Sequence, residues 1–380
     1  MIKVFCLSLF LIINTAWVVA LDVNKNVNSG TSLHQNISTP SESAVLYITN
    51  CFTDLITAYS INPATGMLTQ LNVNVPTGIY PGSITSILPP AKLAGKYLYE
   101  ANYKEASVSE YSIESGYMPL PLNPPEVPTG INGWNINIDP SGRYAYTENP
   151  YANTISTFDI DQSTGVLIPE STVPSQYGPA VMGFNGPWVY VDEFNSSMID
   201  IYSFDSDTGT ITNTNTYVPT GIGPRGIAID NANHVYAINY SSSTISMYLA
   251  NQSTGALVPL SPASIPTGIG PVEISIDLSE QYVYVACFMS NQIFMYKIEP
   301  NGVLQPLNPA YVATGINPRS LALDSNNHIY ASDMYSNQVS MYSINPANGI
   351  LTPLNPPTVA TGTGPYKMSI PLATNNSVAP

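Results

Sequence analysis

One segment of about 47 residues recurs along this chain, and no other feature of the sequence constrains the fold as strongly. Its clearest copies begin at Pro224, Pro271 and Pro318. Each copy contains four apolar runs of strand length, rich in β-branched and aromatic residues and separated by turn residues such as Asn, Ser, Gly and Pro. Each unit is therefore one supersecondary piece that buries its apolar faces only against its neighbours.

Four strands per repeat at this period are typical of a β-propeller blade. Complete units begin near Pro81, Gly133, Pro179, Pro224, Pro271 and Pro318. Residues 365–370 supply only a first strand, and residues 45–68 supply only the second to fourth strands. We therefore expect an all-β fold, a seven-bladed β-propeller of four-stranded antiparallel blades. The N- and C-terminal strands should pair and close the ring, since this removes an exposed sheet edge.

The N-terminus has the pattern of a targeting segment. Residues 1–20 combine one lysine, an apolar run and a small residue at the end, which predicts a secretory signal peptide; an uncleaved anchor helix is the alternative. Residues 21–43, rich in Asn and Ser, are expected to form a flexible leader. We assign residues 44–371 to the propeller and 372–380 to a C-terminal tail. The protein is accordingly expected to be secreted or periplasmic.

The chain is strongly acidic, with 10 basic and 25 acidic residues and a formal net charge of −15. Because no basic patch is present, neither nucleic acid nor an anionic membrane surface is an expected partner. No membrane span is expected after signal cleavage, and a monomer is expected. Cys51 and Cys287 belong to different blades and should remain free, buried thiols. We expect no cofactor and no catalytic metal, although structural Ca²⁺ bound by Asp and Asn oxygens stays open.

The residues that follow the start of each repeat vary between copies, although the strand sequences stay similar. In an up-and-down blade, the loop leading into the first strand and the loop joining strands two and three share one face, here called the top face. Candidate binding residues there are Trp134, Arg225, Glu273, Arg319, Tyr366 and Lys367. An arginine pair suits a carboxylate or phosphate. Alternatively, each arginine pairs with a neighbouring acid such as Glu273, or with loop carbonyls.

A second set of top-face positions lies at the end of each second strand. Asn is the commonest residue there, whereas Glu193 and Asp333 are acidic exceptions. Asn is well suited to ending a strand and starting a turn, so the exceptions are candidate functional residues. The aromatic residues that follow, such as Tyr103 and Tyr240, either stack on a bound sugar or pack the hairpin tips; packing is the favoured interpretation.

The phrase Gly-Pro-Arg-Gly-Ile-Ala-Ile-Asp at 223–230 and the Asp-x-x-Thr-Gly-x-Leu phrase at 161–167 resemble the lactonase-type seven-bladed propellers. That group includes propeller 6-phosphogluconolactonases and carboxymuconate-cyclising enzymes, and the resemblance covers roughly residues 44–371. Its lactonases typically carry Gly-Pro-Arg-His, with a Glu after a nearby second strand. Here the arginine is Arg225, the histidine position is Gly226, and the second strand of that repeat ends in Asn239.

Because that histidine is missing, we expect primarily a non-catalytic binding or interaction scaffold that takes a small anionic ligand, a glycan or a protein on its top face. The alternative is a lactonase-like enzyme that hydrolyses or forms a small anionic lactone of a sugar or dicarboxylate. Arg225 would then stabilise the developing charge, while Glu193 or Glu273 handles the proton. The expected binding residues are Arg319, Trp134, Tyr366, Lys367 and Asp333. The sequence leaves open whether the protein is an enzyme.

Overall fold

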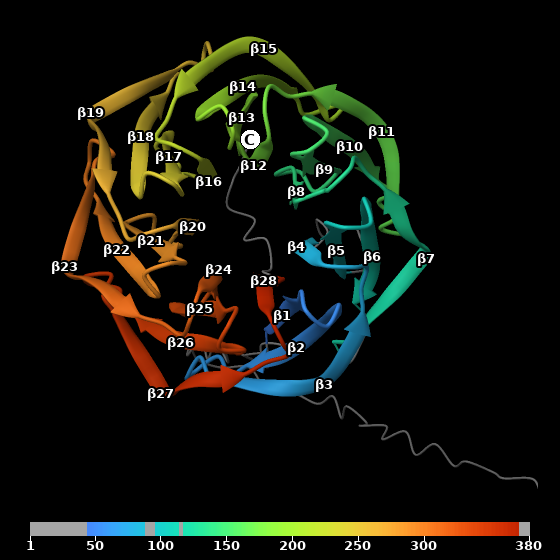
Figure 1. Cartoon of the computed structure of the whole chain (residues 1–380), viewed down its shortest axis with the longest axis vertical. Coiled ribbons are helices and arrows are strands. Elements are labelled where there is room, and N and C mark those ends of the chain that lie inside the picture. Colours follow the sequence, from blue (N-terminus) through green and yellow to red (C-terminus); the bar gives the residue numbers. More distant parts are fainter. Residues whose placement is uncertain (1–43, 88–95, 114–116, 372–380) are drawn as a thin grey trace, which may run out of the picture. The chain divides into compact units, whose positions relative to one another are not determined.

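A computed structural model describes residues 44–87, 96–113 and 117–371. These residues form seven four-stranded antiparallel sheets arranged around a central axis as the blades of a propeller (Figure 1). No helix occurs among them, and so none is available to span a membrane. The predicted fold class is confirmed. The predicted signal peptide (1–20), leader (21–43) and C-terminal tail (372–380) lie outside the described residues.

The ring closes as predicted, because the blade at the junction takes strands from both chain ends (Figure 1). This blade 1 contains β28 (Pro365–Ser369), β1 (Val45–Asn50), β2 (Leu55–Ile61) and β3 (Leu68–Pro76). β1 pairs antiparallel with β28 through Tyr47–Ser369 and Ile48–Met368, with a register shift before Asn50–Pro365.

The other six blades each consist of four consecutive strands. Blade 2 contains β4 (Pro81–Ile87), β5 (Lys96–Asn102), β6 (Ser107–Ile113) and β7 (Pro119–Pro128); blade 3 contains β8 (Asn135–Ile138), β9 (Tyr144–Asn149), β10 (Thr154–Ile160) and β11 (Leu167–Pro174); blade 4 contains β12 (Pro179–Asn185), β13 (Trp188–Glu193), β14 (Met198–Asp205) and β15 (Thr210–Pro219). Blade 5 contains β16 (Pro224–Ile229), β17 (His234–Asn239), β18 (Thr244–Ala250) and β19 (Leu257–Pro266); blade 6 contains β20 (Pro271–Ile276), β21 (Tyr282–Cys287), β22 (Gln292–Ile298) and β23 (Leu304–Ala313); blade 7 contains β24 (Pro318–Leu323), β25 (His328–Asp333), β26 (Gln338–Ile344) and β27 (Leu351–Ala360).

Tyrosines of the repeat link each blade to the next. The tyrosine in the middle of each second strand is fully buried and donates a hydrogen bond to a backbone carbonyl in the following blade. The pairs are Tyr99–Gly165, Tyr146–Gly209, Tyr190–Gly255, Tyr236–Gly302, Tyr284–Gly349 and Tyr330–Gly66, with oxygen–oxygen distances of 2.6–3.1 Å, and Tyr47–Tyr117 at 3.0 Å. At about 1 kcal/mol for each such bond, the repeated contact fixes the spacing of neighbouring blades.

The hydrophobic core lies between blades. One cluster joins Tyr284 and Ile293 of blade 6 to Ile329 and Tyr342 of blade 7, and other clusters join other neighbouring pairs in the same way. Cys51 and Cys287 are buried and free, as predicted. Each blade thus completes its core only with its neighbours, as the repeat requires.

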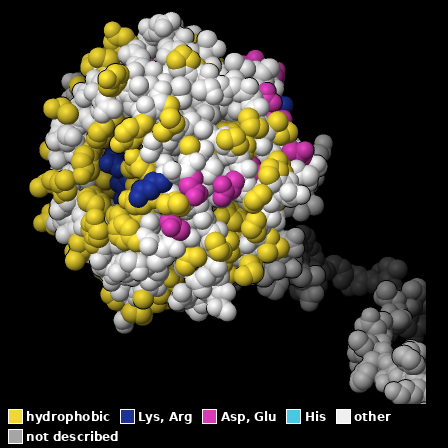
Figure 2. All heavy atoms as spheres, turned by 45° about the vertical axis from the view of Figure 1, so that its right-hand side comes forward, with side chains coloured by type: hydrophobic (Ala, Val, Ile, Leu, Met, Phe, Trp, Pro, Cys, Tyr) yellow, Lys and Arg dark blue, Asp and Glu magenta, His cyan; other side chains and the backbone are white. Residues whose placement is uncertain are grey.

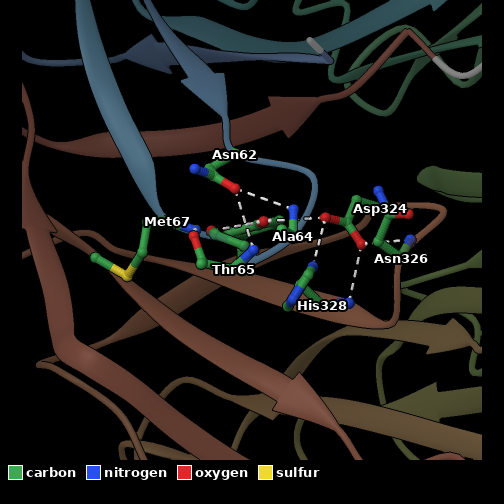
Figure 3. Close-up of polar contacts among 9 residues, drawn as sticks. Asn62, Ala64, Thr65, Met67, Asp324, Asn326 and His328 are labelled. Atoms are coloured by element: carbon green, nitrogen blue, oxygen red, sulfur yellow. Dashed lines mark hydrogen bonds and ion pairs between the residues drawn. The ribbon is translucent and has the colours of Figure 1, made fainter. Parts of the chain in front are cut away.

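His328 is the first residue of β25, at the face opposite the top face. The Asp324 carboxylate accepts hydrogen bonds from the backbone N–H groups of Asn326 and His328, both at 2.9 Å, and lies 2.8 Å from His328 Nδ1 (Figure 3). Gly66 lies against this imidazole with a φ of 69°, and a Cβ there would be 2.4 Å from His328 Cδ2. Asn62 closes the turn that contains Gly66 by accepting hydrogen bonds from the N–H groups of Ala64 and Thr65 (Figure 3). His328 is therefore a structural residue.

Candidate functional site

The top face gathers side chains from the first strands of several blades around the central axis. Arg225, Arg319 and Tyr366 are each the second residue of a first strand, in β16, β24 and β28, and Trp134 directly precedes β8. The loops on this face are tied together, since the N–H of Tyr240 donates to Gly223 O at 2.8 Å and equivalent bonds recur in other blades. Residues in one repeat position thereby converge although they are far apart in sequence.

Two arginines share one aromatic ring. The Cζ atoms of Arg225 and Arg319 lie 4.9 and 5.5 Å from the centroid of the Trp134 indole. Arg225 also lies over Tyr240 at 5.3 Å, and Arg319 lies over Tyr366 at 4.3 Å and donates a hydrogen bond to its hydroxyl. Both guanidinium groups are thus held by aromatic faces, which attract cations without neutralising them.

Neither arginine has a carboxylate within 4.0 Å among the described residues. Glu273, the acid named above as an alternative partner, forms an ion pair with Lys367 instead. Burial, together with the charge of Arg319, lowers the pKa of Arg225 to about 10, so it stays charged at neutral pH. The chain has only three arginines and a net charge of −15, yet two of them meet here without an acid. This arrangement favours an anionic ligand.

Two hollows open beside these arginines. The arginine hollow, of about 220 Å³, is lined by Tyr80, Trp134, Arg225, Tyr240, Phe288, Arg319, Met334, Tyr335 and Tyr366. The aromatic hollow, also of about 220 Å³, is lined by Tyr103, Trp134, Pro150, Tyr151, Gly178, Ala180, Phe194, Asn195 and Arg225. Trp134 and Arg225 belong to both. One face of the molecule shows basic side chains gathered near its middle among hydrophobic ones, with acidic side chains to one side (Figure 2).

Arg225 also lines a third space, the channel hollow, of about 240 Å³ between the first strands. Glu273 and Lys367 line it as well. The side chain of Glu273 retains 21% of its surface exposed, which leaves its carboxylate accessible from the channel. The structure therefore places five of the predicted residues around Arg225. The arginine hollow contains Trp134, Arg319 and Tyr366, and the channel hollow contains Glu273 and Lys367.

Glu193 and Asp333 are placed differently. Both are fully buried, and neither lines any of the three hollows. Glu193 accepts hydrogen bonds from Ser175 Oγ at 2.5 Å and from the Tyr177 N–H at 2.8 Å, and burial raises its pKa to about 7. Asp333 accepts from Ser340 Oγ at 2.6 Å, and burial raises its pKa to about 6. Their contacts are those of residues that hold a loop or an outer strand.

Five residues of the arginine hollow did not enter the predicted set: Tyr80, Tyr240, Phe288, Met334 and Tyr335. Tyr240 occupies the aromatic position after the second strand, for which packing was the favoured interpretation; its ring instead covers Arg225. Tyr80 stands directly before Pro81, where other repeats have Gly or Asn, and it keeps a φ of 57°. A bulky residue in this region of backbone space is uncommon and is often found at functional sites. That departure from the repeat was the signal available in the sequence.

The chain matches the family "Lactonase, 7-bladed beta-propeller" over residues 119–221 and 215–364. It belongs to this family. The 6-phosphogluconolactonase of Pectobacterium carotovorum is 29% identical over 146 residues, which cover 35% of this chain and 42% of that relative. The 6-phosphogluconolactonase of Serratia proteamaculans is 28% identical over 144 residues, which cover 35% of this chain and 43% of the relative. The chain thus spans less than half the length of the curated relatives it matches.

Solved structures share the fold over nearly their whole length. A Bacteroides fragilis protein provisionally named 6-phosphogluconolactonase has a TM-score of 0.74 at 17% identity, with 88% of this chain and 99% of that one covered. A periplasmic gluconolactonase of Pseudomonas aeruginosa has a TM-score of 0.68 at 14% identity, with 87% and 99% covered. At these identities the likeness extends to the fold alone.

The expectation of a non-catalytic scaffold as the main role of this lactonase-family propeller is wrong. The matching family is one of lactonases, and the curated relatives are named 6-phosphogluconolactonases. The alternative, a lactonase-like enzyme, fits these findings better. The missing histidine at Gly226, which had favoured the scaffold, excludes only one way of handling the proton.

No group of three or more His, Cys, Asp or Glu side chains that could hold a metal occurs within the described ranges. Structural Ca²⁺, the oligomeric state and the identity of any partner remain predictions from the sequence.

Proposed function

We propose that this protein hydrolyses a small lactone that carries an anionic group, with the substrate bound in the arginine hollow. The observation that carries this proposal is the pair of guanidinium groups, Arg225 and Arg319, which share the Trp134 ring and have no carboxylate partner among the described residues. Family membership supplies the reaction class. The anionic group would balance the two charges, and the aromatic walls would exclude water around it.

In the proposed reaction, the oxygen of a water molecule adds to the lactone carbonyl, and the ring carbon–oxygen bond then breaks. The product is a hydroxy acid, and the leaving alkoxide takes up a proton. Negative charge develops on the carbonyl oxygen during the addition. Arg225 lines both the arginine hollow and the channel hollow, so its guanidinium is suited to stabilise that charge while Arg319 holds the anionic substituent.

The proton requires a base other than the family's histidine. A side chain at Gly226 has little room, because a Cβ there would lie 3.0 Å from Ile238 Cδ1. Glu273 lines the channel hollow with Arg225 and is accessible from it. We assign Glu273 as the group that accepts the proton of the attacking water and returns it to the leaving oxygen, with Lys367 orienting its carboxylate. Glu193 is engaged by Ser175 and Tyr177 and has no part in this scheme.

The sequence of residues 1–20 supports the further proposal that the enzyme acts outside the cytosol, as a secreted or periplasmic protein. Its substrate would then be an extracytoplasmic lactone. Expression of the full chain and recovery of the protein without residues 1–20 from the medium or periplasm would test this. Retention of an intact N-terminus in the cytosol would contradict it.

The hydrolysis test compares three lactones: a phosphorylated sugar lactone, a carboxylated lactone and a neutral sugar lactone. Proton release is measured in a pH-stat, with the uncatalysed rate subtracted. Arg225→Gln should lower kcat/KM for the anionic lactones by about 100-fold, the loss typical when one donor to a developing oxyanion is removed. Glu273→Gln should lower kcat with little change in KM.

Arg143 provides a matched control for these variants. Its guanidinium also lies over an aromatic ring, 5.1 Å from Tyr144, but on the opposite face, where it donates to Asp207 O. Arg143→Gln should leave kcat/KM unchanged. The proposal fails if the intact protein hydrolyses none of the three lactones, or if the double variant Arg225→Gln, Arg319→Gln retains the activity of Arg143→Gln.

A further inference from the structure

The two hollows of the top face adjoin at Trp134 and Arg225. From this arrangement we infer that the site takes lactones with a second sugar ring, whose lactone ring occupies the arginine hollow and whose appended ring occupies the aromatic hollow. This inference rests on the proposed function, because it names the substrate class of the same site.

The size of the hollows favours a two-ring ligand. Each hollow has a volume of about 220 Å³, below the roughly 300–1,000 Å³ typical of small-molecule sites. The two together reach that range. A single-ring lactone held in the arginine hollow would leave the aromatic hollow filled only by water, against largely apolar walls.

The chemistry of the two hollows differs. Both guanidinium groups line the arginine hollow, whereas the aromatic hollow contains Arg225 alone, at its shared wall. Its other walls include the rings of Tyr103, Tyr151 and Phe194, with the Asn195 amide as a further polar side chain. Aromatic faces suit the C–H faces of an uncharged sugar ring, and an amide can both donate to and accept from its hydroxyls. The charged group of the ligand therefore belongs in the arginine hollow and the neutral ring in the aromatic hollow.

The shared wall is held in place before any ligand binds. The Trp134 ring packs edge-to-face against Tyr103, at 5.2 Å and 85°, and against Tyr366, at 6.4 Å and 78°. A wall fixed from both sides reduces the entropy that binding would otherwise cost. By contrast Tyr151, at the rim of the aromatic hollow, keeps 72% of its surface exposed, and its ring meets Tyr103 at 6.3 Å. Its ring face is thus available to a ligand, and removing it should not disturb the core.

The test uses the product acids gluconate and lactobionate, which carry one carboxylate each and differ by one galactosyl ring. Dissociation constants are measured by isothermal titration calorimetry on the full propeller, without reference to turnover. We expect lactobionate to bind about tenfold more tightly than gluconate, equivalent to about 1.4 kcal/mol. Tyr151→Ala and Phe194→Leu should each reduce that advantage to threefold or less while leaving gluconate binding within twofold. Arg225→Gln should weaken the binding of both acids, because their carboxylate derives from the lactone carbonyl.

Tyr217 supplies the control, since it is exposed on the outer strand β15 and lines neither hollow. Tyr217→Ala should leave both dissociation constants unchanged. Equal affinity for the two acids, no binding of either, or equal loss for both in Tyr151→Ala would overturn the inference. These outcomes are separate from the hydrolysis test, in which single-ring lactones alone decide whether the protein is a lactonase.

Discussion

Glu110 in blade 2 and Met247 in blade 5 occupy the same position of the third strand, and both contact the next blade in the same way. A carboxylate oxygen of Glu110 accepts a hydrogen bond from the backbone N–H of Leu167 at 2.9 Å. The Met247 sulfur accepts a hydrogen bond from the equivalent N–H, that of Leu304, at 3.5 Å. Met295 accepts one from Leu351 N–H in the same way at 3.4 Å. One backbone donor is thus satisfied by a charged group in one part of the ring and by an apolar side chain in another.

The same difference extends along the second strands. Glu148 of β9 and Asp192 of β13 are fully buried, whereas the equivalent residues of blades 5 and 6 are Ile238 and Ala286. Neither oxygen of Asp192 has a hydrogen-bond partner among the described residues, and the same holds for Glu100 of β5. Blades 2 to 4 therefore contain ionisable groups at positions that blades 5 and 6 fill with apolar side chains.

Burial without a cationic partner changes how these acids titrate. It raises the pKa of Glu110 to about 7 and that of Glu148 to about 8, and it raises the pKa of Asp192 well above its usual range. Asp324, in a turn of blade 7, shows the opposite result. Although burial acts to raise its pKa, hydrogen bonds from His328 and Asn326 lower it. Blades 2 to 4 share a backbone with blades 5 and 6 but couple their stability to pH differently.

The largest expected effect is on the whole protein. In an unfolded chain these acids titrate near pH 4, so between about pH 4 and pH 8 the folded state binds more protons than the unfolded state. The free energy of unfolding should therefore be greatest at the acidic end of this window and fall as pH rises through 6 to 8. We expect a difference on the order of 3 kcal/mol between pH 5 and pH 8, measured by urea denaturation.

A variant isolates the cause of this dependence. Glu148→Gln with Asp192→Asn removes both charges at nearly constant volume and should flatten the profile by raising stability at pH 8. Glu170→Gln, on the exposed surface of β11, should leave the profile unchanged. Equal stability at pH 5 and pH 8 in the unmodified protein would show that these acids stay ionised in the fold.

The sequence predicted the ring because each repeat consists of apolar runs of strand length separated by turn residues. Both are local signals that can be recognised without knowledge of the fold. Closure between β1 and β28 followed from counting incomplete units. The buried acids were not predicted, because their side chains are partly enclosed by other repeats, as the contact of Glu110 with Leu167 of the next repeat shows. Only the three-dimensional arrangement shows that neither Glu110 nor Glu148 forms an ion pair with a cation among the described residues. The available signal was an acidic residue at a position where other repeats have an apolar one.

The candidate site was likewise predicted only in part. Arg225, Arg319, Trp134 and Tyr366 were found because they depart from the repeat at one shared position, and the fold brings those positions together. Glu193 departs equally in sequence, yet its side chain is directed to the loop that contains Ser175. Alternation along a strand decides which of two adjacent residues faces which side, and at the end of β13 the Glu193 carboxylate lies against the loop that contains Ser175.

Transferring the charge from blade 2 to blade 5 should have the next largest effect. Met247→Glu places a carboxylate among buried residues such as Tyr236 and Ile245. At pH 8 the free energy of unfolding should fall by about 3 kcal/mol, because the charge has no cationic partner there. At pH 5 the protonated acid can still accept from Leu304 N–H, and the loss should be about 1 kcal/mol.

Met247→Leu separates shape from charge in this comparison. It removes the sulfur acceptor but adds no ionisable group, and should cost less than about 1.5 kcal/mol at either pH. If Met247→Glu is equally destabilising at pH 5 and pH 8, packing rather than ionisation determines which side chain blade 5 tolerates at this position. Blades 2 and 5 would then differ there in shape and not in charge.

The reverse exchange, Glu110→Met, should have the smallest effect. It gives blade 2 the residue found in blade 5, keeps an acceptor near Leu167 N–H and removes a group whose pKa is raised to about 7. At pH 8 we expect a gain of about 1 kcal/mol in the free energy of unfolding, and at pH 5 no gain, because the acid is then largely protonated in the folded state.

Glu110→Gln is the matched control, since its amide oxygen can still accept from Leu167 without carrying charge. A loss of stability at pH 8 in Glu110→Met but not in Glu110→Gln would show that the hydrogen bond to Leu167 outweighs the cost of the buried charge, so that blade 2 depends on an oxygen acceptor where blade 5 does not.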